Sequence, residues 1–174
     1  MITIISGTNR IDSVSSQIAL YYQDILKKKG EESRILDLGT LPPDFIYSAL
    51  YENSGLNNDF NAFQEIIDAT ERFVFIIPEY NNSFPGVLKA FIDGLRYPSS
   101  FEGKKGALVG ISSGLQGASL ALSHFTDILN YLGMHVMPLK PKLSRIEKHM
   151  DESALVNDLY LGLLDKQADQ LLKF

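Results

Sequence analysis

The hydroxyl-rich stretch SGTNRIDSVSS, at residues 6–16, has the side chains of an anion-binding loop. It follows the apolar run Ile2–Ile5 and precedes a helical pattern, so we expect it at the N-terminus of a helix. Free backbone N–H groups and the helix dipole favour an anion there, while hydroxyls add donors and Arg10 adds a planar charged fork. The residue types leave two interpretations open: a phosphate site, or a turn in which Ser13 or Ser15 merely caps the helix.

Several other chemistries are excluded by what the chain lacks. The loop has neither the G-x-x-x-x-G-K-[ST] pattern of nucleotide triphosphate sites nor the G-x-G-x-x-G pattern of Rossmann dinucleotide sites. There are no cysteines, and the three histidines are too scattered for a metal-binding motif at short spacing. We find no defensible serine–histidine–aspartate set or carboxylate pair. We therefore predict no catalytic side chain and no metal ligand.

A second polar loop, PEYNNS at residues 78–83, follows a buried strand and precedes a helix. The apolar run Phe73–Ile77 is short enough for a strand buried on both faces, and Pro78 ends it. Pro85 fits the first turn of the next helix, with Ser83 as a capping candidate. That helix should bury a stripe made of Leu88, Phe91, Ile92 and Leu95. In open α/β sheets such a loop lies where ligands bind, although it could also be a simple turn.

A third loop, SSGLQGA at residues 112–118, follows the small apolar run Gly106–Ile111. Glycines in this loop would allow the backbone to approach a flat ligand closely. Turns rich in serine and glycine are common between strands and helices, so this loop alone indicates little.

The elements that must position these loops alternate between strand and helix five times. We expect strands over residues 2–5, 34–38, 73–77, 106–111 and 135–137, and helices over residues 14–29, 60–70, 85–95, 115–132 and 155–172. Such alternation favours a parallel sheet with helices on both faces and right-handed crossovers. With five strands, the commonest arrangement is the flavodoxin-like order 2-1-3-4-5, in which the loops after strands one and three are neighbours. We expect residues 1–174 to form one domain of this α/β class.

Two segments fit this alternation less well. Residues 39–58 form a long connection that carries Phe45, Tyr47, Tyr51 and Leu56, which indicates either a functional lid or interface, or a loop packed over the sheet edge. Residues 138–150 are basic and contain two prolines, and we expect an extended surface connection there.

The bulk composition is that of an ordinary globular protein, with 45% hydrophobic and 21% charged residues in 174. The formal net charge of -5 and the absence of a long basic run argue against nucleic-acid partners. No apolar stretch approaches the roughly 20 residues that span a bilayer, so we expect no membrane partner. Met1 leads straight into the first strand without the pattern of a signal peptide, which predicts a cytoplasmic location.

The three loops together resemble the NAD(P)H-dependent FMN reductase family, a branch of the flavodoxin-like fold. PEYNNSFPGVLKAFIDGL is similar to the family's signature, SGTNRIDSVSS to its phosphate loop G-S-x-R-x-x-S-x-N, and SSGLQGA to its S-G-x-x-G-G loop. The resemblance covers roughly residues 1–140. Thr8 replaces a serine but keeps the hydroxyl, Ser15 stands where the family usually has asparagine, and Ala118 replaces the last glycine.

The resemblance implies FMN bound without a covalent bond and reduced by NADPH or NADH. It implies phosphate contacts from the first loop and ring contacts from the other two, and Ser16 is added from its expected place in the first helical turn. The cofactor-binding candidates are Thr8, Arg10, Ser13, Ser15, Ser16, Pro78, Glu79, Tyr80, Asn81, Ser113 and Gly114. A carboxylate beside the ring would disfavour its anionic reduced form, so we expect Glu79 to point away and order the loop, or to bond a partner chain.

The implied function is electron transfer from NAD(P)H through FMN to a small acceptor, which in the family is a free flavin, a quinone, an azo compound or a metal oxyanion. Two alternatives stay open: a flavodoxin-type electron carrier without nicotinamide turnover, and a regulatory protein that has lost the ligand. The resemblance also implies a homodimer, or a dimer of dimers, built in part by the helix that begins near Pro85.

Overall fold

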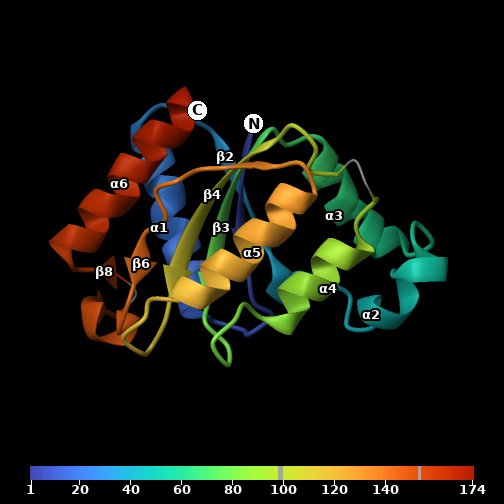
Figure 1. Cartoon of the computed structure of the whole chain (residues 1–174), viewed down its shortest axis with the longest axis horizontal. Helices are drawn as coiled ribbons and strands as arrows, with labels where there is room; N and C mark the ends of the chain where they lie inside the picture. The colour runs from blue at the N-terminus through green and yellow to red at the C-terminus, as the bar shows by residue number, and fades with distance from the viewer. Residues whose placement is uncertain (98–99, 153) are drawn as a thin grey trace.

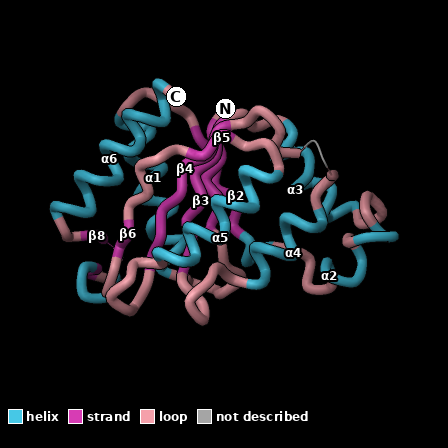
Figure 2. Tube along the Cα trace, viewed as in Figure 1, coloured by secondary structure: helices cyan, strands magenta, loops and turns pink. Residues whose placement is uncertain are grey.

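The computed structural model describes residues 1–97, 100–152 and 154–174. Its main sheet has the parallel order β2-β1-β3-β4-β5, as the sequence predicts (Figures 1 and 2). The strands are β1 (Ile2–Ser6), β2 (Ser33–Asp37), β3 (Arg72–Pro78), β4 (Lys105–Ile111) and β5 (His135–Val136). Ile2 of β1 pairs with Ser33 of β2 and with Arg72 of β3. This register places the carboxyl ends of β1, β3 and β4 at one edge.

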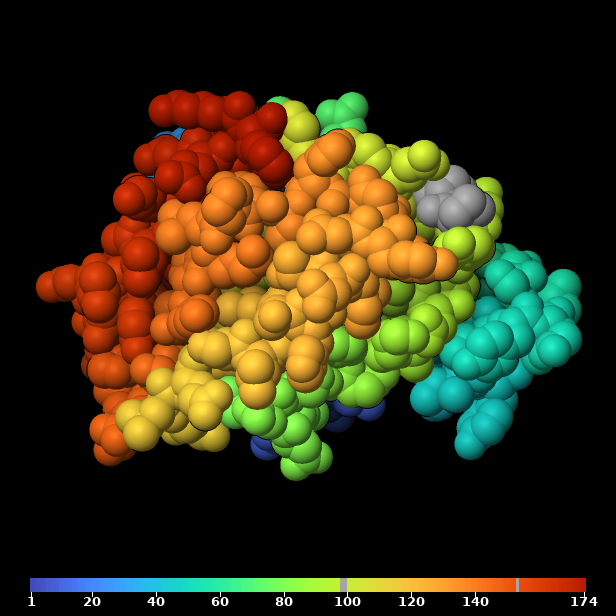
Figure 3. All heavy atoms as spheres, in the orientation of Figure 1, coloured from blue at the N-terminus to red at the C-terminus, as the bar shows by residue number. Residues whose placement is uncertain are grey.

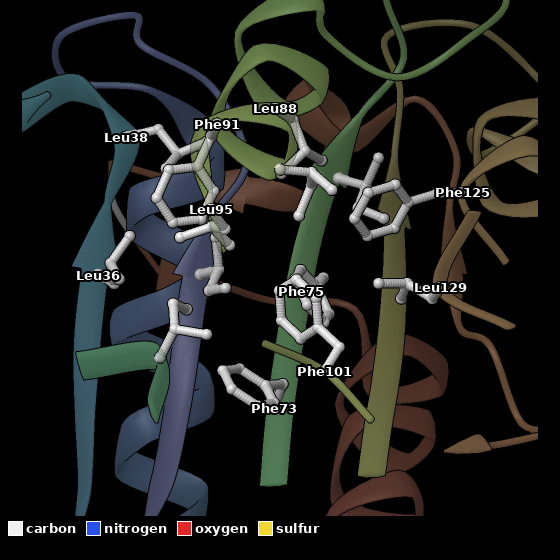
Figure 4. Close-up of a cluster of buried hydrophobic side chains, with 14 of the residues drawn as sticks. Leu36, Leu38, Phe73, Phe75, Leu88, Phe91, Leu95, Phe101, Phe125 and Leu129 are labelled. Carbon is white, nitrogen blue, oxygen red and sulfur yellow. The ribbon is translucent and has the colours of Figure 1, made fainter. Parts of the chain in front are cut away.

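Two apolar layers cover the sheet. One packs α1 (Val14–Lys28) and α6 (Asp158–Lys173) against side chains such as Ile4, Val74 and Val109. The other packs α3 (Asn58–Asp68), α4 (Gly86–Gly94) and α5 (Ser119–Tyr131) against alternate residues of the same strands. Figure 4 shows the second layer, where Phe75 lies between Phe101 and Phe125. β3 is buried on both faces, which explains why its residues form a continuous apolar run.

The predicted fifth strand is interrupted. β5 pairs with the start of β4, and after Pro138 and Pro141 the short strand β6 (Lys142–Leu143) pairs with its end. Proline has no N–H to donate, so the ladder breaks between the two pieces. The expectation of an extended surface connection over residues 138–150 is therefore wrong. Pro141, Leu143 and Ile146 are buried, and the segment continues through the 3-10 helix η3 (Ile146–His149).

Three helix predictions also need correction. α4 begins at Gly86 with Pro85 as its N-cap, and Ser83 does not cap it. α5 begins at Ser119 rather than Leu115, because Gly117 and Ala118 both adopt positive φ and end the preceding loop.

The C-terminal helix begins at Asp158, with Asn157 as its N-cap, so Leu155 lies outside it in the hairpin of β7 (Met150–Asp151) and β8 (Ala154–Leu155). Leu155, Leu159 and Leu163 keep helical spacing and indicate a buried leucine row, but Leu159 is 68% exposed, so the helix buries another face. The residues that α6 buries are Tyr160, Leu164, Gln167, Ala168 and Leu171.

The long connection after β2 contains 3-10 helix η1 (Leu38–Thr40), α2 (Phe45–Ser48) and 3-10 helix η2 (Tyr51–Asn53). Phe45 is buried and stacks on Phe60 of α3 with ring centroids 5.7 Å apart. Tyr47, Tyr51 and Leu56 are exposed. The segment around them forms the cyan lobe at the right of Figure 3. The base of the segment is packed, as one expectation has it, and its exposed side chains leave the lid or interface as a prediction. Among the described residues, no helix combines the length and apolarity that crossing a membrane requires.

Candidate functional site

Three strand-to-helix loops surround a cavity of about 330 Å³ at the carboxyl edge of the sheet. They follow β1, β3 and β4, and in Figure 1 they lie along the lower edge of the molecule. The lining residues are Thr8, Arg10, Ile11, Asp12, Ser13, Val14, Ser15, Pro78, Glu79, Tyr80, Ile111, Ser112, Ser113, Ile146 and Glu147. The cavity thus lies at the switch point of the strand order, where open α/β sheets bind ligands.

The loop after β1 ends in a capped helix. The Ser13 side chain accepts a hydrogen bond from Ser16 N at 3.1 Å, and the Ser16 hydroxyl donates to the Ser13 carbonyl at 2.7 Å. The N–H groups of Val14 and Ser15 lie in the first turn, where the helix offers them no carbonyl acceptor. These two N–H groups and the helix dipole can therefore bind an anion. Ser13 therefore caps α1 while the same turn keeps donors for an anion, and the two interpretations of the sequence are compatible.

A hydrogen bond between side chains joins the first loop to the second. The Tyr80 hydroxyl lies 2.8 Å from Thr8 Oγ1, and Arg10 N donates to the same oxygen at 3.3 Å. A threonine hydroxyl accepts two hydrogen bonds and donates one. If Tyr80 donates, both acceptor positions of Thr8 are filled, and its own O–H is left to donate into the cavity. Thr8 is buried, and these two contacts hold its side chain beside the cavity.

The loop after β3 is a tight hairpin. Tyr80 and Ser83 exchange backbone hydrogen bonds at 2.8 and 3.0 Å, and Asn81 and Asn82 between them have φ values of 50° and 65°. Positive φ at both central positions defines a type I′ turn, which asparagine tolerates. The Ser83 hydroxyl lies 3.0 Å from His124 Nδ1 on α5, which anchors the turn. Since Glu79 N and Tyr80 N already donate to backbone carbonyls, they are not free to bond a ring.

Glu79 connects the second loop to the third. Its Oε2 accepts a hydrogen bond from Ala118 N at 3.0 Å, at the N-terminus of α5. A carboxylate is favoured there by the helix dipole and by the unpaired amide. This bond agrees with the loop-ordering part of the expectation for Glu79. Glu79 also lines the cavity, so the expectation that it points away from the site does not hold.

The loop after β4 is shaped by close backbone contacts. The Ser112 hydroxyl accepts from Gly117 N and donates to the Gly114 carbonyl, both at 3.0 Å. Gly117 has a φ of 57°, and a Cβ there would lie 2.7 Å from the Cβ of Lys142. Ser113 and Gly114 remain exposed beside the cavity mouth.

The cavity has few charges of its own. Of the lining residues that the structure describes, Arg10 is the only cation, and the carboxylates are Asp12, Glu79 and Glu147. An anion here would therefore rely on hydroxyls, backbone amides and the helix dipole, together with one guanidinium.

Eight of the eleven predicted cofactor-binding residues line this cavity, and Ser16, Asn81 and Gly114 do not. Sequence reasoning did not select Ile146 and Glu147, which come from η3. No motif marks these two residues, because they reach the site through the broken fifth strand. Ser112 belongs to the loop at residues 112–118 and Ile111 directly precedes it, so both could have been found from that loop.

Comparison with known proteins identifies the family of the chain. The sequence profile described as NADPH-dependent FMN reductase matches residues 1–144. The chain belongs to the NADPH-dependent FMN reductase family. It is 33% identical over 139 residues to a 2-hydroxy-1,4-benzoquinone reductase of a Burkholderia species, covering 78% of this chain and 73% of that protein. It is 30% identical over 171 residues to an NAD(P)H-dependent FMN reductase of Pseudomonas aeruginosa, covering 97% and 87%.

Solved structures share the fold of this FMN reductase family member. The flavoenzyme NAD(P)H:(acceptor) oxidoreductase FerB of Paracoccus denitrificans superposes with a TM-score of 0.77 at 23% identity, covering 99% of this chain and 94% of that one. An NADH:FMN oxidoreductase in its apo form gives the same TM-score at 22% identity. At these identities the similarity shows the flavodoxin-like architecture.

The residues present fit the cofactor of the family. One end of the cavity offers the hydroxyl-rich turn, the amides of α1 and Arg10, which suit a phosphate monoester. The other end offers the hairpin of Tyr80 and the exposed backbone of residues 113–114, which suit a flat ring.

Proposed function

We propose that the cavity holds FMN, with its phosphate at the β1 loop and its ring between the β3 and β4 loops. The chain thereby transfers electrons from NAD(P)H to a small acceptor. The observation that carries this proposal is the convergence of all three family loops on one cavity at the switch point of the sheet. FMN and the NAD(P)H reductant follow from the family, and the placement of individual residues is our proposal.

The protein's part in this chemistry is binding and placement. FMN supplies the redox chemistry when it is bound, so the site needs no triad or metal. Thr8, Ser13 and Ser15 donate hydrogen bonds to the phosphate, and Arg10 neutralises part of its charge. Pro78 fixes the exit of β3, Tyr80 positions the Thr8 hydroxyl, and Glu79 holds the β3 and β4 loops together. Ser113 also lines the cavity, whereas Ser16, Asn81 and Gly114 only adjoin lining residues in the sequence.

Among acceptors, we favour quinones. The Burkholderia relative is named as a benzoquinone reductase, and two relatives from Pseudomonas putida at 27% identity are named as quinone reductases. Free flavins, azo compounds and metal oxyanions are the other acceptors to be compared with quinones.

The test measures the oxidation of NADPH and NADH by the FMN-loaded protein, monitored through the absorbance of the reduced nicotinamide. Benzoquinone, free FMN, an azo dye and chromate serve as the acceptors. We expect nicotinamide oxidation that depends on the acceptor and is fastest with the quinone. Tight FMN binding without nicotinamide oxidation would instead identify a flavodoxin-type carrier. A colourless protein that binds no added FMN would identify the regulatory alternative.

The proposed function also bears on the domain boundaries, the cellular location and the oligomeric state of the protein. We propose that residues 1–174 act as one FMN-binding domain in the cytoplasm, where NAD(P)H is the common reductant. We also propose a homodimer, or a dimer of dimers, formed through α4 and α5. An apolar cavity of about 610 Å³ lies between these helices, and the exposed rings of Tyr51, Tyr97 and Tyr131 line it. A second copy of the chain would cover these rings.

A further inference from the structure

The segment Lys140–His149, here named the basic strap, concentrates positive charge in an acidic protein. It carries Lys140, Lys142, Arg145 and Lys148 against the single carboxylate Glu147, while the whole chain has a formal charge of -5. Lys142, Arg145 and Lys148 are exposed, and Lys140 is half-buried. Neither the FMN phosphate nor the sheet explains why these cations gather in one place.

The backbone of the basic strap is fixed to the loop after β4. Arg145 N donates to the Gly114 carbonyl at 2.9 Å, and Ile146 N donates to the Ser112 carbonyl at 3.0 Å. In return, Ser112 N donates to the Leu143 carbonyl at 3.1 Å. These bonds hold Arg145 at a φ of 47°, a left-handed conformation that is unfavourable for arginine. The cations are therefore attached to the loop proposed to flank the flavin ring.

The charges of the basic strap are not neutralised within the described protein. The ion pairs of the described residues use Lys29, Lys89 and Arg96, and none uses a residue of the strap. Burial, with repulsion from Lys142, lowers the pKa of Lys140. Like charges held together without counterions favour an anionic ligand.

This anion differs from the phosphate of FMN. The strap contributes only Ile146 and Glu147 to the flavin cavity, whereas Lys142, Arg145 and Lys148 do not line it. The remaining phosphate-bearing molecule of the reaction is the nicotinamide dinucleotide, whose nicotinamide must reach the ring beside the β4 loop. We propose that the basic strap binds the phosphates of NAD(P)H, with Lys142 and Arg145 as the main contacts. This inference rests on the proposed function.

The test removes the two charges and compares hydride donors with and without phosphates. In the double variant Lys142→Gln/Arg145→Gln, we expect the KM for NADPH and NADH to rise about tenfold or more, because each charged hydrogen bond is worth about that factor. The rate with N-benzyl-dihydronicotinamide, which has no phosphate, should stay unchanged. A KM effect on both dinucleotides indicates pyrophosphate contacts, and an effect on NADPH alone indicates 2′-phosphate contacts. Both results support the proposal.

A matched control and a binding measurement complete the design. Lys27→Gln/Lys28→Gln removes the same charge from the far end of α1, and the KM values should then change less than twofold. Calorimetry of the FMN-loaded protein with ADP-ribose should show binding that the strap variant weakens, even if turnover fails for another reason. The FMN dissociation constant should be the same in both variants.

Two results would overturn the proposal. One is an unchanged KM and unchanged ADP-ribose binding in the strap variant. The other is an equal loss of rate with the benzyl donor, which would mean that the substitutions only disturb the β4 loop. Failure of the wild-type protein to bind FMN would instead reject the proposed function, so the two failures can be distinguished.

Discussion

Arg10 is the residue on which the phosphate end of the site depends most. Among the described residues that line the cavity, it is the only cation, and the carboxylates of Asp12 and Glu147 line the same cavity. We expect Arg10→Ala to weaken FMN binding by about 1.5–3 kcal/mol, since hydrogen bonds to charged groups contribute about that amount. Fluorescence titration of the apoprotein with FMN measures the change.

Riboflavin provides the control for this variant because it lacks the phosphate. Its affinity should be the same in the wild-type protein and in Arg10→Ala. An unchanged FMN dissociation constant would remove Arg10 from the site, and an equal loss for riboflavin would mean that the loop itself had moved.

Residue roles of this kind were only partly predictable from the sequence. The composition of the loop after β1 predicted an anion, because hydroxyls and an arginine at a helix N-terminus can be recognised locally in the sequence. The family motif then indicated that this anion is the phosphate of FMN. The bond from Tyr80 to Thr8 spans 72 positions of the chain. It depends on the register that brings β1 beside β3, so no local pattern could show it.

At the scale of elements, Glu79 joins two loops that the sheet alone would leave separate. Its carboxylate accepts from Ala118 N at the start of α5. We expect Glu79→Ala to lower the free energy of unfolding by about 0.5–2 kcal/mol, the usual effect of removing such a cap. Urea unfolding followed by circular dichroism measures this change. Glu31→Ala, at an exposed carboxylate beyond the far end of α1, should change it by less than about 0.5 kcal/mol.

The fate of FMN binding in Glu79→Ala separates a loop-ordering role from a simple stabilising one. Weaker binding of both FMN and riboflavin would show that the bond shapes the ring end of the site. Unfolding energies equal to those of the wild-type protein would contradict the capping role.

A second prediction at this scale concerns the contact between α1 and α6. Lys29 Nζ lies 2.8 Å from the carboxylates of Asp165 and Asp169, and its hydrogen bond lowers the pKa of Asp169 below the ordinary 3.8. A lowered pKa in the folded state stabilises the fold above pH 3.8, and this contribution is lost as the pH falls through the lowered value. Lys29→Met should therefore destabilise the protein at pH 7 and much less at pH 2.5.

Urea unfolding at the two pH values checks this expectation, because urea adds no salt that would screen the pair. Lys28→Met, in the same turn of α1, is the control and should show no such pH dependence. A loss of stability that is equal at pH 7 and pH 2.5 would show that Lys29 acts through the packing of its aliphatic stem instead.

Helices and strands were predictable where their hydrophobic residues follow a single regular pattern. β1, β3 and β4 are short, mainly apolar runs, and their positions follow from the sequence. The start of α5 was misplaced because Leu115 keeps the helical spacing but lies in the preceding loop with 71% of its surface exposed. The broken fifth strand was missed because its second part, Lys142–Leu143, is short and carries a lysine. It also follows two prolines, a pattern that indicates a surface connection.

At the scale of the whole molecule, the strand order followed from the number of elements and the known handedness of their crossovers, because these rules depend on topology and not on side chains. Surfaces are less predictable. The face formed by α4 and α5 lies at the front of Figures 1 and 3, and the sequence cannot show that Tyr51, Tyr97 and Tyr131 meet around one groove.

This tyrosine-lined groove gives the prediction for the assembled molecule. Tyr131 is 77% exposed, and its hydroxyl lies 3.3 Å from that of Tyr97. Light scattering should give the wild-type protein at least twice the chain mass of 19.4 kDa at micromolar concentration. Tyr131→Glu should give a single chain, because a carboxylate buried there loses its hydration. The two cations that line the groove, Lys89 and Arg96, are already paired with Asp93 and Asp68.

Tyr47→Glu is the matched control for this experiment. Tyr47 is 83% exposed but does not line the groove, so the substitution should leave the assembly unchanged. A wild-type mass of one chain would reject the dimer, and dissociation by both variants would move the interface toward the segment after β2. Because the groove and the flavin cavity are formed by different residues, monomeric Tyr131→Glu should still bind FMN, unless the partner chain also contributes to the ring end of the site.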